Sequence, residues 1–132
     1  EQQHVYTTGW DIDEGYRAAA SVLGGRDRPT AIVCSNDRVA TGVLLYAAAA
    51  GLRVPQDLSV VGYDDQQNLA ANLVPALTTV ALPHAEIGAA AMSMLLDAVE
   101  GITPAVENTE AGNLLMPCRI IPRASTAAVP TG

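Results

Sequence analysis

Short apolar runs alternate with longer apolar segments along the chain. The runs at residues 30–34 (TAIVC) and 58–62 (LSVVG) are rich in β-branched residues, which favours buried strands. Between them, residues 37–50 predict a helix that begins after Asn36, a good capping residue, and stops at Gly51, which readily takes a left-handed conformation. Because strands covered on both faces are uniformly apolar, this unit predicts a parallel sheet with helices on its faces.

The same alternation continues on both sides of this unit. The other predicted elements are also short, and polar or glycine-containing turns separate them. Strands are expected at residues 4–8 and at residues 113–121, where Pro117 interrupts the strand, and a turn followed by a strand is expected within residues 75–81. Helices are expected at residues 12–23, 66–72 and 83–101, and an acidic loop at residues 102–112. The pattern predicts an α/β domain over residues 1–122, followed by a tail over residues 123–132 that frays.

The helix predicted at residues 37–50 is apolar on every side. No charged residue occurs between Arg38 and Arg53, and Leu45 lies on a different face from Val43. One sheet covers only one side of a helix, so the second face needs a further cover. That cover is either another helix of the same chain or a second copy of the protein.

Composition and charge narrow the classes of function. Seven basic and 14 acidic residues give the 132-residue chain a net charge of -7, which argues against binding of a nucleic-acid backbone by this segment. The longest apolar stretch, residues 43–52, is too short to cross a membrane, and the amino end lacks the basic and then apolar pattern of a secretion signal. We expect a cytoplasmic protein with no membrane partner.

The two cysteines, Cys34 and Cys118, stand singly in predicted strands. They are expected to be buried free thiols of a reducing compartment, with a disulfide as the alternative. The sequence has no Cys-x-x-Cys pair and no His-x-x-x-His spacing, so we expect no metal site and no cofactor.

A polar or aromatic turn follows each of three predicted strands. Ligands of parallel sheets bind beyond the carboxyl ends of the strands, so Trp10, Asn36 and Asp64 are expected to approach one another across a cleft. An indole, an amide and a carboxylate suit a small ligand with hydroxyl groups or polar ring edges. Each residue also has a structural alternative: packing for Trp10, helix capping for Asn36 or its neighbour Asp37, and turn formation for Asp64.

Catalysis is weakly supported. Asp64 and Asp65 are paired carboxylates, but adjacent side chains on a turn rarely face one substrate bond, and no partner nucleophile is indicated. The sequence contains no Gly-x-Ser-x-Gly elbow, phosphate loop or Gly-x-Gly-x-x-Gly fingerprint. His4 and His84 lie far from these turns in the sequence. We therefore expect no catalytic residue.

Two stretches carry a family resemblance: NDRVATGVLLYAAAAGLRVPQDLSVVGYDD at residues 36–65 and PALTTVALP at residues 75–83. They resemble the effector-binding core of the LacI/GalR family, and the likeness covers most of residues 9–101 without gaps. The resemblance implies the C-terminal subdomain of a type I periplasmic-binding-protein-like fold. It also places an amino-terminal subdomain and a DNA-binding headpiece outside this chain, with the helix at residues 83–101 crossing over to that subdomain. If that subdomain is absent, the apolar stripe of the helix folds back on the sheet, docks on a neighbouring chain or stays loosely held.

The resemblance implies a transcriptional regulator that contacts operator DNA only through its headpiece and binds a sugar or nucleobase-like effector. Family members hold the effector at positions matching Trp10, Asn36 and Asp64. They form homodimers through positions matching a further set of residues: Ile12, Thr41, Leu45, Ala48 and Leu69. The alternative is a sugar-binding protein of an ABC transporter, which shares this fold. Gly9 and Leu82 depart from the family pattern, so the type of ligand is not inherited from it.

Overall fold

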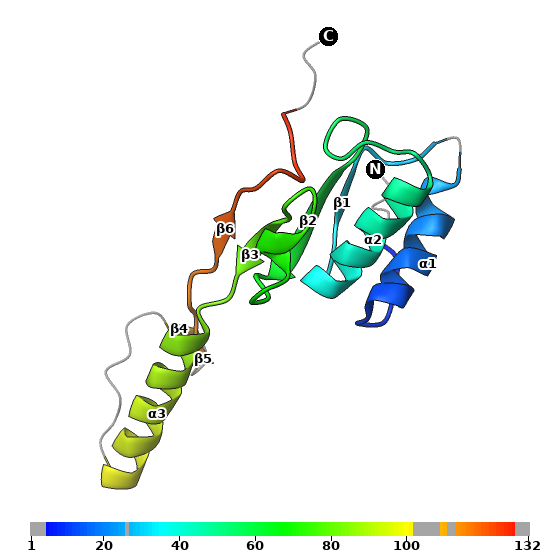
Figure 1. Ribbon diagram of the computed structural model, residues 1–132. Helices are drawn as coiled ribbons and strands as arrows, with labels where there is room; N and C mark the ends of the chain where they lie inside the picture. Colours follow the sequence, from blue (N-terminus) through cyan, green and yellow to red (C-terminus); the bar gives the residue numbers. More distant parts are fainter. Residues whose placement is uncertain (1–4, 26, 102–108, 111–112, 129–132) are drawn as a thin grey trace. The chain divides into compact units, whose positions relative to one another are not determined.

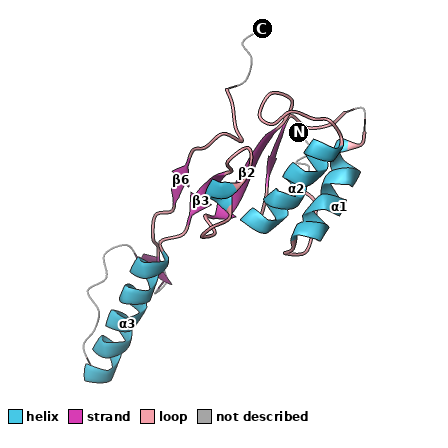
Figure 2. Ribbon diagram, in the orientation of Figure 1, coloured by secondary structure: helices cyan, strands magenta, loops and turns pink. Residues whose placement is uncertain are grey.

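The computed structural model describes residues 5–25, 27–101, 109–110 and 113–128. The chain divides into two compact units. The first comprises Glu1–Ala81 together with Ile120–Gly132, and the second comprises Leu82–Arg119. Figures 1 and 2 show their helices and strands. The candidate site lies wholly in the first unit.

A sheet in the order β1-β2-β3-β6 forms the centre of the first unit. Its strands are β1 (Ala31–Val33), β2 (Ser59–Asp64), β3 (Thr78–Ala81) and β6 (Arg119–Ile121). Strands β1, β2 and β3 run parallel, with Val33 opposite Val61 and Val61 opposite Thr78. The predicted strands at residues 30–34 and 58–62 and the parallel pairing between them are therefore confirmed.

Two helices pack side by side beside this sheet, α1 (Ile12–Leu23) and α2 (Asp37–Ala49) (Figure 2). The core is a continuous apolar cluster that includes Val43 and Ala47 of α2, Leu58 and Val60 of or next to β2, and Leu77 before β3. Leu58 and Leu77 are at most 1% exposed. Both helices match their predicted ranges, because their apolar spacing and capping residues are local signals.

Helices α1 and α2 approach closely at two glycines. A Cβ atom on Gly42 would overlap the carbonyl oxygen of Ile12, and one on Gly15 would overlap the carbonyl oxygen of Val39. The absence of side chains at both positions lets the two backbones come together. Another helix of the same chain thus covers part of α2, which was one of the two alternatives for its second face.

Two local predictions differ from the structure. Val5 to Thr8 form no strand, because a strand is defined by hydrogen bonds to a neighbour and this stretch makes none of that kind; His4 lies outside the described residues. The helix predicted at residues 66–72 is reduced to the short 3-10 helix η1 (Ala70–Asn72). The strand predicted at residues 113–121 is interrupted at Pro117, as expected: β5 (Asn113–Leu114) and β6 lie on either side of this residue, which cannot donate a ladder hydrogen bond.

The tail predicted at residues 123–132 was expected to fray, but its residues Arg123 to Thr126 are bonded to the sheet. Residues 129–132 lie outside the described residues. The Ser125 side chain is fully buried; its hydroxyl donates to the Val60 carbonyl at 2.6 Å and accepts from the Thr78 amide at 2.8 Å. The Val60 amide in turn donates to the Ser125 carbonyl at 2.9 Å, and the Ala124 amide to the Ala76 carbonyl at 2.9 Å. These residues complete the hydrogen bonding of β2 and β3.

The second unit contains α3 (His84–Glu100) and the short antiparallel pair β4 (Thr109–Glu110) and β5. Most of the loop predicted at residues 102–112 lies outside the described residues. The helix ends at Gly101, whose φ of 71° is the left-handed conformation that glycine takes easily. No residue of α3 is buried, and five large apolar side chains are 44–77% exposed: Ile87, Met92, Leu95, Leu96 and Val99.

Within the described part of the chain, none of the helices has the length and apolar character needed to span a bilayer.

Candidate functional site

Asn36 follows β1 and serves as the N-cap of α2. Its Oδ1 accepts a hydrogen bond from the Val39 amide at 2.7 Å, and its Nδ2 donates to the carbonyl oxygen of Trp10 at 3.1 Å. The residue is only 7% exposed. The capping alternative is therefore realised, and the same side chain also ties the turn before α1 to the amino end of α2.

Trp10 reaches the site from the turn before α1. Its backbone is held by Asn36, whereas its side chain is 71% exposed. This exposure shows that the indole of Trp10 does not pack in the interior of this chain, so the packing alternative is not supported. A large aromatic ring held open to solvent by a fixed backbone is suited to stacking on a ligand.

Asp64 is the last residue of β2 and sits in strained backbone. Its φ is 99°, and Asp65 follows with a φ of 49°, both in a region that non-glycine residues rarely adopt. Its Oδ1 atom is buried and has no hydrogen-bond partner within the chain. Burial, and after it the negative charge of Asp37, raises the pKa of Asp64 to about 6.

Asp37 is the residue that the sequence left undecided between capping and binding. It is completely buried at the first position of α2. Its Oδ1 accepts from the Thr79 hydroxyl at 2.6 Å and its Oδ2 from the Gln66 amide at 2.7 Å. Gly62 leaves room for this carboxylate, because a Cβ there would overlap Oδ1. A glycine inside the LSVVG strand was the one sequence signal of this close approach.

The three predicted ligand-binding residues lie at the same edge of the sheet. Asn36 follows β1 and Asp64 ends its parallel neighbour β2. Trp10 and Asn36 are joined by a hydrogen bond, and Asp37, the residue after Asn36, lies beside Asp64. Asn36 is buried and both atoms of its amide are bonded within the chain. The groups left for a small molecule are the exposed indole of Trp10 and the Oδ1 atom of Asp64, which has no partner in the chain.

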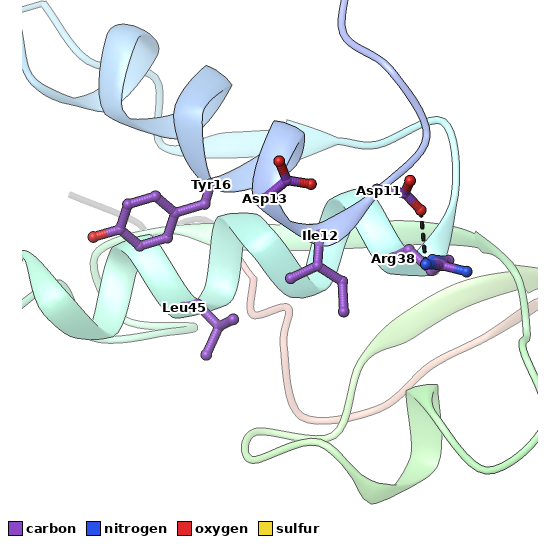
Figure 3. A pocket seen from close by; sticks show the side chains of 6 residues that line it. All are labelled: Asp11, Ile12, Asp13, Tyr16, Arg38 and Leu45. Atoms are coloured by element: carbon purple, nitrogen blue, oxygen red, sulfur yellow. Dashed lines mark ion pairs between the residues drawn. The ribbon is translucent and has the colours of Figure 1, made fainter.

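Two hollows in this unit border helices α1 and α2. One, of about 550 Å³, is lined by six residues of or next to α1 and α2: Asp11, Ile12, Asp13, Tyr16, Arg38 and Leu45 (Figure 3). The other, of about 560 Å³, has a largely apolar lining contributed by the stretch before α1, by α1 and by β1. Neither is lined by Trp10, Asn36 or Asp64, so the cleft expected between these residues stays a prediction.

The residues predicted for a dimer interface differ in how exposed they are in this chain. Ile12 and Leu45 border the hollow of Figure 3, Leu45 is 52% exposed and Ala48 is also exposed. Leu69 is half-buried. Thr41 is only 6% exposed, and its hydroxyl donates to the Asp37 carbonyl at 2.7 Å. Its side chain is therefore hydrogen-bonded within α2 and is not free to contact a second copy of the protein.

The two cysteines differ from each other. Both are free thiols, as expected, but only Cys34 is buried and Cys118 is exposed. Burial, followed by the negative charge of Asp37, raises the pKa of Cys34 to about 12, which keeps the thiol protonated and unreactive at neutral pH. The expectation of burial was wrong for Cys118, because this residue lies between the short strands β5 and β6 and not inside one strand.

Comparison with known proteins identifies the family. Residues 1–126 match the periplasmic binding protein-like domain. The HTH-type transcriptional repressor CytR of Escherichia coli is 37% identical over 130 residues, which cover 98% of this chain and 36% of that repressor. The HTH-type transcriptional repressor PurR of Erwinia tasmaniensis is 47% identical over 90 residues, which cover 68% of this chain and 26% of that repressor. The chain belongs to the LacI/GalR family.

Solved structures of LacI/GalR proteins agree with this fold. A lac repressor dimer bound to operator and the anti-inducer ONPF is 32% identical, with a TM-score of 0.81 over 92% of this chain and 40% of that one. A LacI family regulator from an Arthrobacter species in complex with lactose is 31% identical, with a TM-score of 0.78 over 91% of this chain and 43% of that one. The α/β fold of the periplasmic-binding-protein type is thus confirmed. The chain spans about a quarter to a third of the length of the curated repressors that it matches.

Proposed function

We propose that this chain is the effector-sensing part of a cytoplasmic LacI/GalR-type transcriptional regulator. In this proposal Trp10, Asn36 and Asp64 hold a sugar or nucleobase-like effector, and binding changes the affinity of a separate headpiece for operator DNA. The observation that carries it is the buried Oδ1 atom of Asp64, which has no partner in the chain and lies on a strained turn at the carboxyl edge of the sheet. A buried polar atom without a partner is costly, and a ligand hydroxyl or ring N–H would supply the missing hydrogen bond.

The surroundings of Asp64 support a small polar ligand. The exposed indole of Trp10 offers an apolar face, which fits the flat face of a sugar ring or a nucleobase. The solved regulator that binds lactose shows that this fold accommodates a sugar. The transporter alternative has less support, because the curated relatives are transcriptional repressors.

Replacing Asp64 by alanine in the full-length regulator that carries this chain should weaken effector binding by roughly 1.5–3 kcal/mol, about 10- to 150-fold in Kd, because a charge-assisted hydrogen bond is lost. Isothermal titration calorimetry with lactose, ribose and a panel of nucleosides would first identify a ligand and then compare the variant with the parent protein.

Asp57→Ala is the matched control, since Asp57 pairs with Arg53 outside the candidate site at 2.8 Å. The control should keep the affinity of the parent protein. An unchanged Kd for Asp64→Ala would remove Asp64 from the binding site and with it the main support for this function.

We further propose that the regulator forms a homodimer through the surface that carries Ile12, Leu45 and Ala48. Leu45 and Ala48 lie four and seven positions after Thr41 on α2, yet unlike Thr41 they remain exposed. An exposed apolar strip beside a hollow is suited to a copy of itself across a two-fold axis. The lac repressor structure that resembles this chain is a dimer.

Leu45→Arg should convert the full-length regulator from dimer to monomer without unfolding it, because the side chain is 52% exposed in the chain yet would bring like charges together across the two-fold axis. Light scattering gives the mass, and circular dichroism checks that the fold persists. Ser21→Arg adds the same charge at another exposed helical position and should leave the dimer intact. A parent protein that is monomeric at all concentrations, or a Leu45→Arg variant that stays dimeric, would contradict the proposed interface.

A further inference from the structure

Asp37 joins three elements that are far apart in the sequence. It begins α2, while its two carboxylate oxygens accept hydrogen bonds from Thr79 of β3 and from the backbone of Gln66, 42 and 29 positions away. The carboxylate is completely buried, and Gly62 of β2 packs against it without a side chain. A buried carboxylate with this set of donors has a defined orientation, and it holds the turn after β2 in place.

The Gln66 amide lies two residues after Asp64, on the far side of the strained pair Asp64 and Asp65. Positive φ angles at two consecutive non-glycine residues persist only when the surrounding structure holds them. The hydrogen bond from Gln66 to Asp37 at 2.7 Å supplies one such restraint. The ion pair between Asp65 and Arg123 at 2.8 Å supplies another. Asp37 therefore influences which way the Asp64 side chain points.

The carboxyl groups of Asp37 and Asp64 interact: burial raises the pKa of Asp64, and the negative charge of Asp37 is the next largest cause. Two neighbouring carboxylates repel, so the pair is stabilised when one proton is shared between them. The raised pKa of Asp64 places this proton on Asp64.

We propose that Asp37 is a positioning residue for Asp64: it fixes the turn that presents Asp64, and it shares a proton with Asp64 that decides whether Asp64 meets a ligand as a hydrogen-bond donor or as a charged acceptor. The consequence for ligand binding rests on the function proposed above. The positioning and the shared proton are properties of the chain alone.

Among the described residues, three other charged or titratable groups near this turn are Asp65, Cys34 and Tyr63. Asp65 is paired with Arg123, whose guanidinium also donates to the Leu77 carbonyl at 2.9 Å. Cys34 stays protonated up to about pH 12 and carries no charge at neutral pH. Tyr63 precedes Asp64 in β2, and neighbouring side chains of a strand point to opposite faces. Asp37 is therefore the charge with which Asp64 interacts most directly.

The proton has a predictable effect on stability. The pKa of Asp64 in the folded chain is raised from 3.8 to about 6 by burial and by Asp37. Between these two values the folded chain holds a proton that the unfolded chain has released, so the free energy of unfolding falls as the pH rises through this range. The stabilisation by this proton is fully present below the unfolded pKa of 3.8, and it is lost above the folded pKa of about 6.

The decisive experiment is a titration of the Asp64 carboxyl carbon by NMR in the full chain. The parent protein should give a midpoint near pH 6. Asp37→Asn keeps an acceptor for Gln66 but removes the charge, so the midpoint should fall, while burial, the larger cause, keeps it above the ordinary aspartate value. Asp65→Asn removes the adjacent carboxylate, which Arg123 neutralises, and should leave the midpoint unchanged.

Thr79→Val provides a second variant that retains the charge of Asp37. It removes the hydroxyl that donates to Asp37 at 2.6 Å, so the shared proton is held more tightly and the midpoint of the pair should rise. A midpoint that does not fall in Asp37→Asn, or that moves equally in Asp65→Asn, would overturn the shared proton. If Asp37→Asn does not fold, an unchanged midpoint in Thr79→Val overturns it in the same way.

Hydrogen exchange at the Gln66 amide tests the positioning role separately. Asp37→Ala removes the acceptor and should speed this exchange by at least about tenfold, whereas Asp37→Asn should stay close to the parent protein. Equal protection in all three proteins would overturn the role. Calorimetry with lactose completes the set: an Asp64→Asn variant that binds like the parent would refute the proposed function and leave the NMR result standing, so the two failures are distinguishable.

Discussion

Gly42→Ala should lower the free energy of unfolding by about 2 kcal/mol, although alanine is the better helix former. The added Cβ would overlap the carbonyl oxygen of Ile12 and come within 2.5 Å of the Tyr16 amide nitrogen. Both are backbone atoms of α1, so the overlap is relieved only by moving one helix away from the other. Overpacking of a close contact typically costs about 1–3 kcal/mol and occasionally more, which exceeds the gain of about 1 kcal/mol in helix propensity.

Denaturant unfolding at a fixed protein concentration measures this loss. Gly88→Ala is the matched control, because Gly88 also lies inside a helix but has open space at its Cβ position. The control should keep the parent stability or gain up to about 1 kcal/mol through propensity alone. Equal stabilisation by both substitutions would show that the two helices do not depend on the glycine contact.

Ser125→Ala should lower the free energy of unfolding by about 2–5 kcal/mol. The substitution leaves the Val60 carbonyl and the Thr78 amide inside the protein without their hydroxyl partner, which bonds them at 2.6 and 2.8 Å. Each buried backbone group without a partner costs about 1–3 kcal/mol. The sequence alone does not predict this effect, because Ser125 lies in the segment that was expected to fray.

Ser21→Ala is the control for the loss of a serine hydroxyl, since Ser21 is exposed on α1. It should change the free energy of unfolding by no more than about 0.5 kcal/mol, as surface substitutions usually do. Thermal and denaturant unfolding of both variants would be compared with the parent protein. A Ser125→Ala variant within about 0.5 kcal/mol of the parent would mean that water or a rearranged backbone replaces the hydroxyl.

The sequence by itself determined those features that depend on near neighbours in the chain. The limits of α1 and α2 follow from apolar residues at helical spacing and from capping residues such as Asn36, which act within one turn. Strands β1 and β2 follow from short runs of β-branched residues, although the structure leaves Val33 of β1 78% exposed. The placement of Asn36 and Asp64 at one edge of the sheet then follows, because parallel strands end at the same edge.

Only the tertiary structure decided those features that depend on distant partners. Whether residues 5–8 form a strand depends on a neighbouring strand and not on their own composition. The crossing of α1 and α2 decides that Thr41 is buried while Leu45 is exposed, although both lie on the face that the sequence assigned to an interface. The periodic pattern shows which residues share a face of the helix, but it does not show on which face another element packs.

The same reason explains what was missed at the candidate site. The sequence left Asp37 undecided between helix capping and ligand binding, because local patterns describe only its neighbours in the chain. Its bonds to Gln66 and Thr79 span 29 and 42 positions, and those from Ser125 to Val60 and Thr78 span 65 and 47. Hydrogen bonds of this kind depend on the order of the strands in the sheet. The sequence therefore determined where the polar residues of the site stand, and the fold decided which of them are held together and share a charge.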